Sequence, residues 1–490
     1  MIKLYSVKTI RDADLKTTET IPAIDLMYNA GNKIFNSSTF NGKTAIICGK
    51  GNNAGDGLVV ALLLNENNKY VDIYLIDDKL SETSTYYLNK CKDKNINIIK
   101  FNEDVNFNQY DFIVDAIFGT GFKGKPEGLY DTAINKINNS NSYVISCDIN
   151  SGLNGDTGLY ENAVKSDLTV SVGYYKTGLF LNKAKDVIKE LINVDIKLLT
   201  PENPYYLLEE KDIIFKDRLN YSNKGDYGYI ALVGGSNMYS GAIRLATMAN
   251  CAMRSGAGVV SVFAPSSISN IIQANILEST IYPLKEKDGF IKFDEDEFKN
   301  LLKYKAITFG MGIGNNEETK KALEYLLLNY DKTLVIDADG LNALSQIKNY
   351  KTKAKLILTP HIKEFSRLTN LTIDEILNDE INISKTYAKN NNVVLLLKGP
   401  TTIITDGSDI YLSPTGSAGM ATAGSGDVLS GIIGALAGSY EPIKAAYMGA
   451  YINGYAGMLA EKNNSSITMV ASDTVNNIKK AIELLNKASK

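Results

Sequence analysis

The chain alternates between short, continuously apolar runs and longer stretches with the polar and apolar spacing of helices. Up to residue 175 the apolar runs are TAIICG, YVDIYLID, INIIKF, DFIVDAIFG, SYVISCDI and DLTVSVGYY. Strands that are apolar along their whole length are typical of parallel sheets covered by helices on both faces. This pattern predicts an α/β fold for the first part of the chain.

The same pattern fades between residues 200 and 225, where Pro, Asn and charged residues accumulate, and then resumes. The later runs are YIALVGGS, VVSVFAP, AITFGMGIG, TLVIDADG, KLILTPH and VVLLLKG. A length of 490 residues also favours two or three domains. We therefore predict two α/β domains, residues 1–212 and 213–490, each with a mainly parallel sheet flanked by helices.

Charge and hydropathy exclude several classes of partner. The chain has 52 Lys and Arg against 55 Asp and Glu, and no basic stripe, so nucleic-acid binding is not indicated. Charge appears too early at the start for a signal peptide, and no apolar run reaches membrane-spanning length. The small-residue run VLSGIIGALAG is interpreted as a buried helix. We expect a cytoplasmic protein without a membrane partner.

The cysteines and the single histidine limit the metal sites and catalytic groups that the chain can form. The four cysteines are scattered and form no C-x-x-C pair, which favours a reducing cytosol and argues against structural zinc. The chain has a single histidine, His361, so a multi-histidine metal site is excluded. Catalysis must therefore use carboxylates, lysines, backbone donors or that one imidazole.

Chemically interesting residues cluster where the predicted strands end, which is where open parallel sheets bind their ligands. In the first domain these residues are Asn52, Asn53, Asp56, Asp115, Asp148 and Ser151; in the second they are Gly312, Gly314, Asp337, Asp339, His361, Lys398 and Asp427. The arrangement predicts two candidate pockets.

The loop GKGNNAGDG follows the first strand of the first domain. Its glycines permit a tight turn, and Gly49-x-Gly51-x-x-Ala54 satisfies a loose dinucleotide fingerprint, with Asp72 or Asp77 placed for a ribose. A plain strand-to-helix turn with Asp56 as helix N-cap is the alternative. The carboxamides of the two asparagines fit a ligand or a hard cation better than a turn. Together with Asp115, Asp148 and Ser151 they could hold a cation and one acid/base carboxylate.

The motifs NNAGDG, VDAIFGTGFKGKP and CDINSG, in this order, resemble the NAD(P)H-hydrate epimerase family over about residues 1–210. The resemblance implies a Rossmann-like domain that interconverts the R and S epimers of hydrated NADH and NADPH. It implies a potassium ion held by Asn53, Asp115 and Ser151, and Asp148 as acid/base. The implied substrate-binding residues are Asn52, Asn53, Ala54, Gly55, Asp56, Gly119, Thr120, Gly121, Phe122, Lys123, Gly124, Lys125 and Asp148.

Two positions depart from that family's usual pattern. Asn150 stands in CDINSG where proline is usual, and Tyr28 replaces a common glutamate. Because Asn lacks the φ restraint of proline, we expect a less rigid turn around Asp148.

The stretch GMATAGSGDVLSGIIGALAG, residues 419–438, predicts an anion hole at the start of a helix. Asp427 at this helix start could take a proton from an attacking hydroxyl. The alternative is a close-packed helix start capped by Asp427. The motif resembles that of the ribokinase-like superfamily. A Walker A loop is absent, since NGKT at 41–44 lacks the leading glycine.

Further motifs resemble the ADP/ATP-dependent NAD(P)H-hydrate dehydratase family over about residues 225–480: GGSNMYSGAIRLA, GMGIG, DADGLNAL, TPHIKEFSRL and LKGPTTII. The resemblance implies phosphorylation of the C6 hydroxyl of the S epimer, with magnesium and ADP or ATP, followed by phosphate elimination. The implied hydrate site is Ala242, Gly312, Gly314, His361 and Asp427. The implied nucleotide site is Lys398, Gly399, Pro400, Thr401, Thr402 and Gly426.

His361 has two interpretations, a hydrogen-bonded structural residue or a substrate contact. We favour substrate contact, because the chain otherwise contains no histidine. Asp337 and Asp339 are interpreted as turn or capping residues and are left outside the predicted sites.

The sequence therefore predicts a two-domain repair enzyme that acts on hydrated NADH and NADPH. We expect small-molecule substrates and a homo-oligomer. A vitamin or sugar kinase with an appended binding domain is the first alternative, and a phosphorylated product that persists would distinguish it. A non-enzymatic scaffold is the second, and the retained Asn53, Asp115 and Asp148 argue against it.

Overall fold

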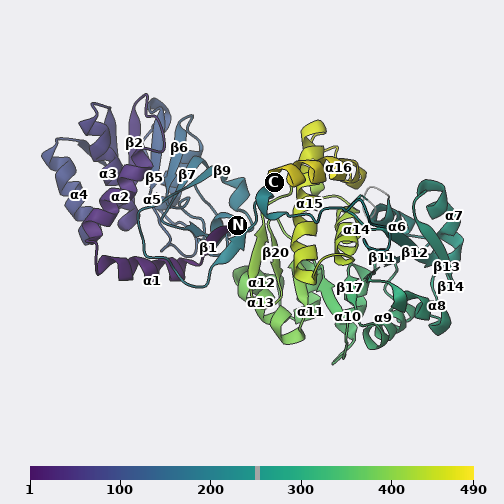
Figure 1. The fold of residues 1–490 in the computed structure, drawn as a ribbon. Helices are drawn as coiled ribbons and strands as arrows, with labels where there is room; N and C mark the ends of the chain where they lie inside the picture. Colours follow the sequence, from purple (N-terminus) through teal and green to yellow (C-terminus); the bar gives the residue numbers. More distant parts are fainter. Residues whose placement is uncertain (249–253, 490) are drawn as a thin grey trace. The chain divides into compact units, whose positions relative to one another are not determined.

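The computed structural model describes residues 1–248 and 254–489; Cys251 lies outside these ranges. The chain divides into two compact units. We call Lys3–Tyr205 the N-terminal unit, and Tyr206–Lys490 with Met1–Ile2 the C-terminal unit. Figure 1 draws the first in purple to blue and most of the second in teal to yellow.

The N-terminal unit is built on a seven-stranded parallel sheet of order β4-β3-β2-β5-β6-β7-β9. This is the strand order of a Rossmann-like fold, and the order reverses between β2 and β5. The strands are β2 (Thr44–Cys48), β3 (Val71–Leu75), β4 (Asn97–Lys100), β5 (Phe112–Ala116), β6 (Tyr143–Cys147), β7 (Ser166–Val172) and β9 (Ile188–Val194).

Helices cover both faces of this sheet, as the apolar strands predict. Ile46 and Cys48 of β2 pack in one cluster with the nearly all-apolar α3, whereas Ala45 and Ile47 pack in another with α5. Successive side chains of a strand point to opposite faces, so both faces need apolar residues. The helices are α1 (Val7–Thr18), α2 (Ala23–Phe35), α3 (Asn52–Glu66), α4 (Glu82–Asp93) and α5 (Leu129–Asn138); a short parallel pair joins β1 (Ile2–Tyr5) to β8 (Tyr175–Lys176).

The main sheet of the C-terminal unit is mainly parallel, in the order β13-β12-β11-β16-β17-β18-β19-β20-β21-β10. Only the pairs β19–β20 and β20–β21 within this order are antiparallel. The strands are β10 (Tyr205–Leu207), β11 (Tyr229–Val233), β12 (Val259–Pro265), β13 (Thr280–Leu284), β16 (Ala306–Phe309), β17 (Thr333–Ile336), β18 (Lys355–Leu358), β19 (Val394–Leu397), β20 (Thr402–Thr405) and β21 (Ile410–Ser413); β14 (Glu286–Lys287) and β15 (Phe290–Ile291) form a separate pair.

Helix α14 (Ser425–Ala437) packs on β11, β16 and β17, and α15 (Pro442–Asn463) packs on β18 to β20. Residues Val428–Ala437 are buried, which confirms the predicted buried helix. The remaining helices are α6 (Ser240–Thr247), α7 (Ser266–Asn275), α8 (Glu295–Lys299), α9 (Glu317–Asn329), α10 (Asp339–Gln346), α11 (Ile362–Thr369), α12 (Ile373–Asn378), α13 (Glu380–Asn391) and α16 (Ala471–Ala488).

All twelve apolar runs quoted above form strands, and the α/β fold class is confirmed. Several strands were not predicted, among them β9 and the sheet-edge strand β13. Both are partly exposed and carry charged or polar residues, so they lack the continuous apolar pattern. No helix in the described ranges is long and apolar enough to cross a membrane.

Candidate active sites

A cavity of about 930 Å³ lies in the N-terminal unit, at the switch point between β2 and β5. Ligands of doubly wound sheets bind at this position. Most of the predicted substrate-binding residues line it: Asn52, Asn53, Asp56, Gly119, Thr120, Gly121, Phe122, Lys123, Lys125 and Asp148. Ala54 and Gly55 are buried in α3 behind the lining, and Gly124 forms the turn between Lys123 and Lys125.

Of the predicted cation ligands, Asn53 lines this cavity, whereas Asp115 and Ser151 are fully buried outside its lining. The Ser151 hydroxyl and backbone N–H donate to Asp115, at 2.5 and 2.9 Å, and Ser146 Oγ donates at 2.8 Å. Burial raises the pKa of Asp115, although these hydrogen bonds oppose the shift. Asn53 Nδ2 donates to the Phe118 carbonyl at 2.9 Å, while Asn53 Oδ1 is buried without a hydrogen-bond partner.

This donor set fits a hard monovalent cation. The Phe118 carbonyl accepts from Asn53 Nδ2 and, at 3.3 Å, from the Ser151 hydroxyl, which also donates to Asp115, so these oxygen-bearing side chains are linked through one carbonyl. A buried, unpartnered carboxamide oxygen costs free energy unless something binds it. The predicted potassium ligands are therefore close together, and Asn53 Oδ1 has no hydrogen-bond partner among the residues that the structure describes.

Asp148 is held at the cavity wall by Lys176, which sequence reasoning missed. Lys176 is 1 % exposed, and its Nζ donates to Asp148 Oδ1 and, at 2.8 Å, to the Val172 carbonyl. The Val172 N–H donates to the same Asp148 oxygen at 2.9 Å. Asp148 itself has φ of 65°, an uncommon conformation for a residue with a side chain. The carboxylate is thus fixed by a buried cation and a backbone donor.

Two more carboxyl groups share this environment. Asp56 of α3 is half-buried at the cavity, and desolvation there, reinforced by Asp148 and then Asp14, raises its pKa well above the ordinary value. The pKa of Asp14, from α1, is also raised, by burial and then by Asp148. Three carboxyls around the Lys176 ammonium cannot all ionise cheaply in a buried place. The shared environment therefore disfavours the ionised forms of Asp56 and Asp14.

Two of the alternative roles, helix capping by Asp56 and ribose binding by Asp72, do not fit the structure, whereas ribose binding by Asp77 stays a prediction. Helix α3 begins at Asn52 with Gly51 as its N-cap, so Asp56 lies inside the helix and caps nothing. Asp72 is buried and accepts hydrogen bonds from Tyr110 at 2.6 Å and Asn97 at 2.8 Å, which leaves it unsuited to a ribose.

We expected a less rigid turn at Asn150, but hydrogen bonds of the Asn150 side chain hold this turn. Its amide nitrogen donates to Val164 O, Ser166 Oγ and Val187 O at 2.9 to 3.0 Å. Its Oδ1 accepts from Thr169 Oγ1 at 2.6 Å. The side chain is fully buried, so four hydrogen bonds take the place of the proline restraint.

The rim of the cavity carries groups suited to a dinucleotide. The rings of Phe118 and Phe122 stack at 4.2 Å between centroids, and Tyr130 stacks on Phe118 at 4.9 Å. Aromatic faces of this kind hold planar rings. Arg11 and Lys50 line the cavity beside the predicted lysines, and motif reasoning missed both.

In the C-terminal unit the residues after three strands converge on Asp337. Its carboxylate is buried and accepts from Thr359 Oγ1 at 2.8 Å, Lys398 Nζ at 3.0 Å and Ser430 Oγ at 2.7 Å. Burial by itself lowers the pKa of the Lys398 ammonium. The negative charges of Asp337 and then Glu364 outweigh burial, so the pKa is raised. The sequence suggests a turn or capping role for Asp337, but in the structure this residue lies at the centre of the cluster.

Helix α14 begins beside this cluster. A Cβ atom on Gly426 would lie 3.4 Å from Lys398 Nζ, so the helix start, with its free N–H groups, approaches the ammonium closely. Burial, followed by the charge of Asp337, raises the pKa of Asp427 to about 7. A group that titrates there can exchange a proton at neutral pH. Of the predicted nucleotide-binding residues, Lys398, Gly399, Pro400 and Thr401 lie between β19 and β20, and Thr402 opens β20.

The predicted hydrate-binding glycines adopt conformations that favour glycine. Gly312 has φ of 62°, and a Cβ there would meet the Ala242 methyl at 2.9 Å, so these two predicted residues are neighbours. Gly314 N donates to Asp339 Oδ2 at 2.9 Å. Asp339 therefore braces the GMGIG loop, a role that sequence reasoning did not assign.

His361 caps helix α11. Its Nδ1 accepts from the backbone N–H of Lys363 and Glu364 at 3.1 and 3.3 Å, and its side chain is half exposed. Burial, then the charge of Lys398, lowers the pKa of the imidazole, which favours the neutral form required for capping. The hydrogen-bonded structural role of His361 is thus observed. Its Nε2 lies 3.5 Å from the Glu364 carboxylate.

Comparisons with known proteins show the family of both halves of the chain. The sequence model of the family described as NAD(P)H-hydrate dehydratase matches residues 230–480, and that of the YjeF-related protein N-terminus matches residues 23–178. The bifunctional NAD(P)H-hydrate repair enzyme Nnr of Dictyoglomus turgidum is 32% identical, with 98% of both chains covered. The chain belongs to the bifunctional NAD(P)H-hydrate repair enzyme family.

Another repair enzyme and a solved dehydratase structure are also similar to this chain. The repair enzyme of Moorella thermoacetica is 34% identical and covers 92% of this chain, with 91% of its own length aligned. The ADP/ATP-dependent NAD(P)H-hydrate dehydratase of Bacillus subtilis, co-crystallised with ATP and Mg²⁺, matches with a TM-score of 0.51 and 27% identity. That match covers 57% of this chain and 99% of the Bacillus subtilis chain, which confirms the ribokinase-like fold.

Proposed function

We propose that the N-terminal unit interconverts the R and S epimers of hydrated NADH and NADPH. The observation that carries this proposal is the meeting of Asp148, Lys176 and Asp56 in one cavity at the switch point of a dinucleotide-type sheet. Epimerisation at a carbon bearing a hydroxyl and a ring nitrogen needs a proton shuttle, but no redox group.

A route through ring opening uses these residues directly. Asp148 takes the proton of the C6 hydroxyl, the bond from C6 to the ring nitrogen breaks, and C6 becomes an aldehyde. The ring nitrogen takes up a proton, which Asp56, a cavity residue with a raised pKa, would supply. Closure on the other face of the aldehyde reverses each transfer and gives the other epimer. Lys176 positions Asp148 throughout.

Asn53, Asp115 and Ser151, with the Phe118 carbonyl, would hold potassium. When bound, the ion supplies a positive charge that fixes the loop after β2 against the loop after β5. The unpartnered Asn53 Oδ1 supports this assignment.

The C-terminal unit, in this proposal, dehydrates the S hydrate with ADP or ATP. Asp427 takes the proton of the C6 hydroxyl as that oxygen attacks the terminal phosphorus. The N–H groups at the start of α14 and the Lys398 ammonium stabilise the transferred phosphoryl group. The C6–O bond then breaks, phosphate leaves, and loss of a proton from C5 restores the double bond. Magnesium would enter with the nucleotide.

The test uses the full chain with hydrated NADH as a mixture of epimers, ADP or ATP, magnesium and potassium. We expect the absorbance of reduced nicotinamide to return completely, with nucleotide consumed in equal amount. Accumulation of a phosphorylated nicotinamide product, without recovery of absorbance, would instead identify a kinase. Recovery that stops when the S epimer is exhausted would contradict the epimerase assignment.

A further inference from the structure

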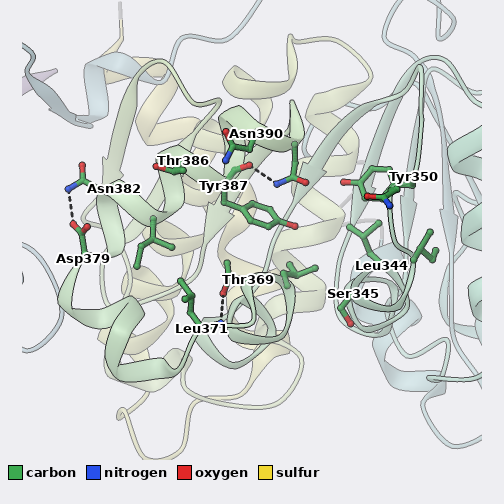
Figure 2. A pocket seen from close by; sticks show the side chains of 15 residues that line it. Leu344, Ser345, Tyr350, Thr369, Leu371, Asp379, Asn382, Thr386, Tyr387 and Asn390 are labelled. Atoms are coloured by element: carbon green, nitrogen blue, oxygen red, sulfur yellow. Dashed lines mark hydrogen bonds between the residues drawn. The ribbon is translucent and has the colours of Figure 1, made fainter.

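A second pocket in the C-terminal unit lies apart from the two sites described above. Its volume is about 470 Å³, within the range of small-molecule sites. One wall is α13, and the other is made of the C-terminal ends of α10 and α11 with the segments that follow them. Figure 2 shows Tyr387 of α13 in the middle of the pocket, extending toward Tyr350.

The lining offers hydrogen bonds that the protein leaves unused. The Tyr350 hydroxyl is buried and has no hydrogen-bond partner. Side chains of Asn349, Thr386 and Asn390 also line the pocket. A buried phenol without a partner is costly, so the site gains free energy when a ligand supplies one.

The charges in the pocket exclude an anionic ligand. Among the described residues, no lysine or arginine lines it, and the one carboxylate that does, Asp379, accepts from Asn382 Nδ2 at 2.7 Å. A phosphate or carboxylate would therefore meet no cation and one negative charge. Apolar side chains such as Leu371 and Ile383 alternate with the carboxamides along the walls.

From this chemistry we propose that the pocket binds an uncharged nucleoside, which has a planar base. Adenosine represents this class. Tyrosine rings provide faces for a heterocycle. Asparagine carboxamides pair with the ring edge of adenine through one donor and one acceptor. The cavity has room for the attached ribose. This inference is independent of the function proposed above.

The pocket is placed to act on the dehydratase site. Helix α10 begins at Asp339, which holds Gly314, and α11 begins after its cap His361. Both helices end at the pocket, and Arg367 of α11 donates to Asn342 of α10 at 2.8 Å. An eight-residue helix is about 12 Å long, so a ligand there lies about one helix length from Asp339 and His361. A nucleoside bound between these helix ends is expected to restrain both helices.

Calorimetric titration of the full chain with adenosine tests the proposal, with ADP and magnesium kept in excess to fill the nucleotide site. We expect a Kd on the order of 0.1 mM for a ligand of this size. AMP should bind at least tenfold more weakly, because its phosphate meets no cation. Hydrogen exchange should slow in residues 362–391 on adding adenosine, and remain unchanged in the N-terminal unit.

Tyr350→Phe removes only the unpartnered hydroxyl and should weaken adenosine binding about tenfold. It should leave the melting temperature unchanged or higher, since a buried unsatisfied group is lost. Tyr143→Phe, the same change at an exposed position of the N-terminal unit, should bind adenosine as the wild type does. Absence of binding under excess ADP, AMP binding as tightly as adenosine, or full affinity in Tyr350→Phe would each overturn the proposal.

Discussion

At the scale of single residues, the surroundings of Asp427 predict how the rate of dehydration depends on pH. Its pKa is raised to about 7 by burial and by Asp337, and only the ionised form can take a proton. We therefore expect kcat/KM for dehydration to rise with pH, about tenfold per unit below pH 7, and to level off above it. A rate independent of pH from 5.5 to 8 would contradict this role.

Asp427→Asn should lower dehydration of the S hydrate by roughly a hundredfold or more and remove the rise with pH. Asp409→Asn, at an exposed turn of the same unit, is the matched control and should keep both the rate and the profile. The measurement is recovery of reduced-nicotinamide absorbance from purified S hydrate.

Lys176 provides the second test at this scale. Lys176→Met removes the cation that holds Asp148, so the carboxyls of the cluster should take up protons more readily. Epimerisation should fall at least tenfold, and the remaining activity should shift to higher pH. Lys176→Arg should retain more activity than Lys176→Met.

Lys189→Met is the control for this change, because it breaks the surface pair with Asp167. It should epimerise at the wild-type rate. Equal losses in the two methionine variants would show that Lys176 acts only through general stability. Both are measured by the rate at which purified R hydrate becomes S hydrate.

At the scale of elements, close packing of α14 depends on its glycines. A Cβ on Gly431 would lie 2.3 Å from the Ala246 carbonyl oxygen of α6, which backbone atoms cannot easily avoid. Gly431→Ala should therefore destabilise the C-terminal unit by about 1–3 kcal/mol, although alanine favours helices. The calorimetric transition that ADP raises reports on this unit.

Gly241→Ala is the matched control within α6. A Cβ there would have nothing within 4 Å, so alanine should be neutral or stabilising by up to about 1 kcal/mol. If both alanine variants melt alike, the close approach of α6 and α14 does not limit stability.

At the scale of the whole molecule, each proposed reaction has its residues within one unit. Asp148→Ala should leave dehydration of purified S hydrate intact. Given mixed epimers, this variant should consume S quickly. A slow phase should follow, limited by the spontaneous epimerisation of R. Asp427→Asn should do the reverse, equilibrating R and S while restoring almost no NADH. Loss of both activities in either variant would refute the division between the units.

Several features follow from the sequence by itself. Continuous apolar runs identified the parallel strands, because a strand covered on both faces needs apolar residues at every position. Residues at strand ends identified the two sites, because parallel strands bring their carboxyl ends to one edge. Asn53, Asp115 and Ser151, distant in the sequence, could be grouped on that basis together with the family resemblance.

Other features were decided only by the tertiary structure. Lys176 belongs to the site because β7 and the turn after it bring a buried ammonium to Asp148, and no local pattern marks that contact. Asp337 looks like a turn residue until Lys398 and Ser430, 61 and 93 positions away, are placed around it. Asn150 departs from the family pattern, yet four long-range hydrogen bonds restore its turn. Hydrophobic periodicity is a local property, whereas the partners of a buried polar group are set by which strands become neighbours.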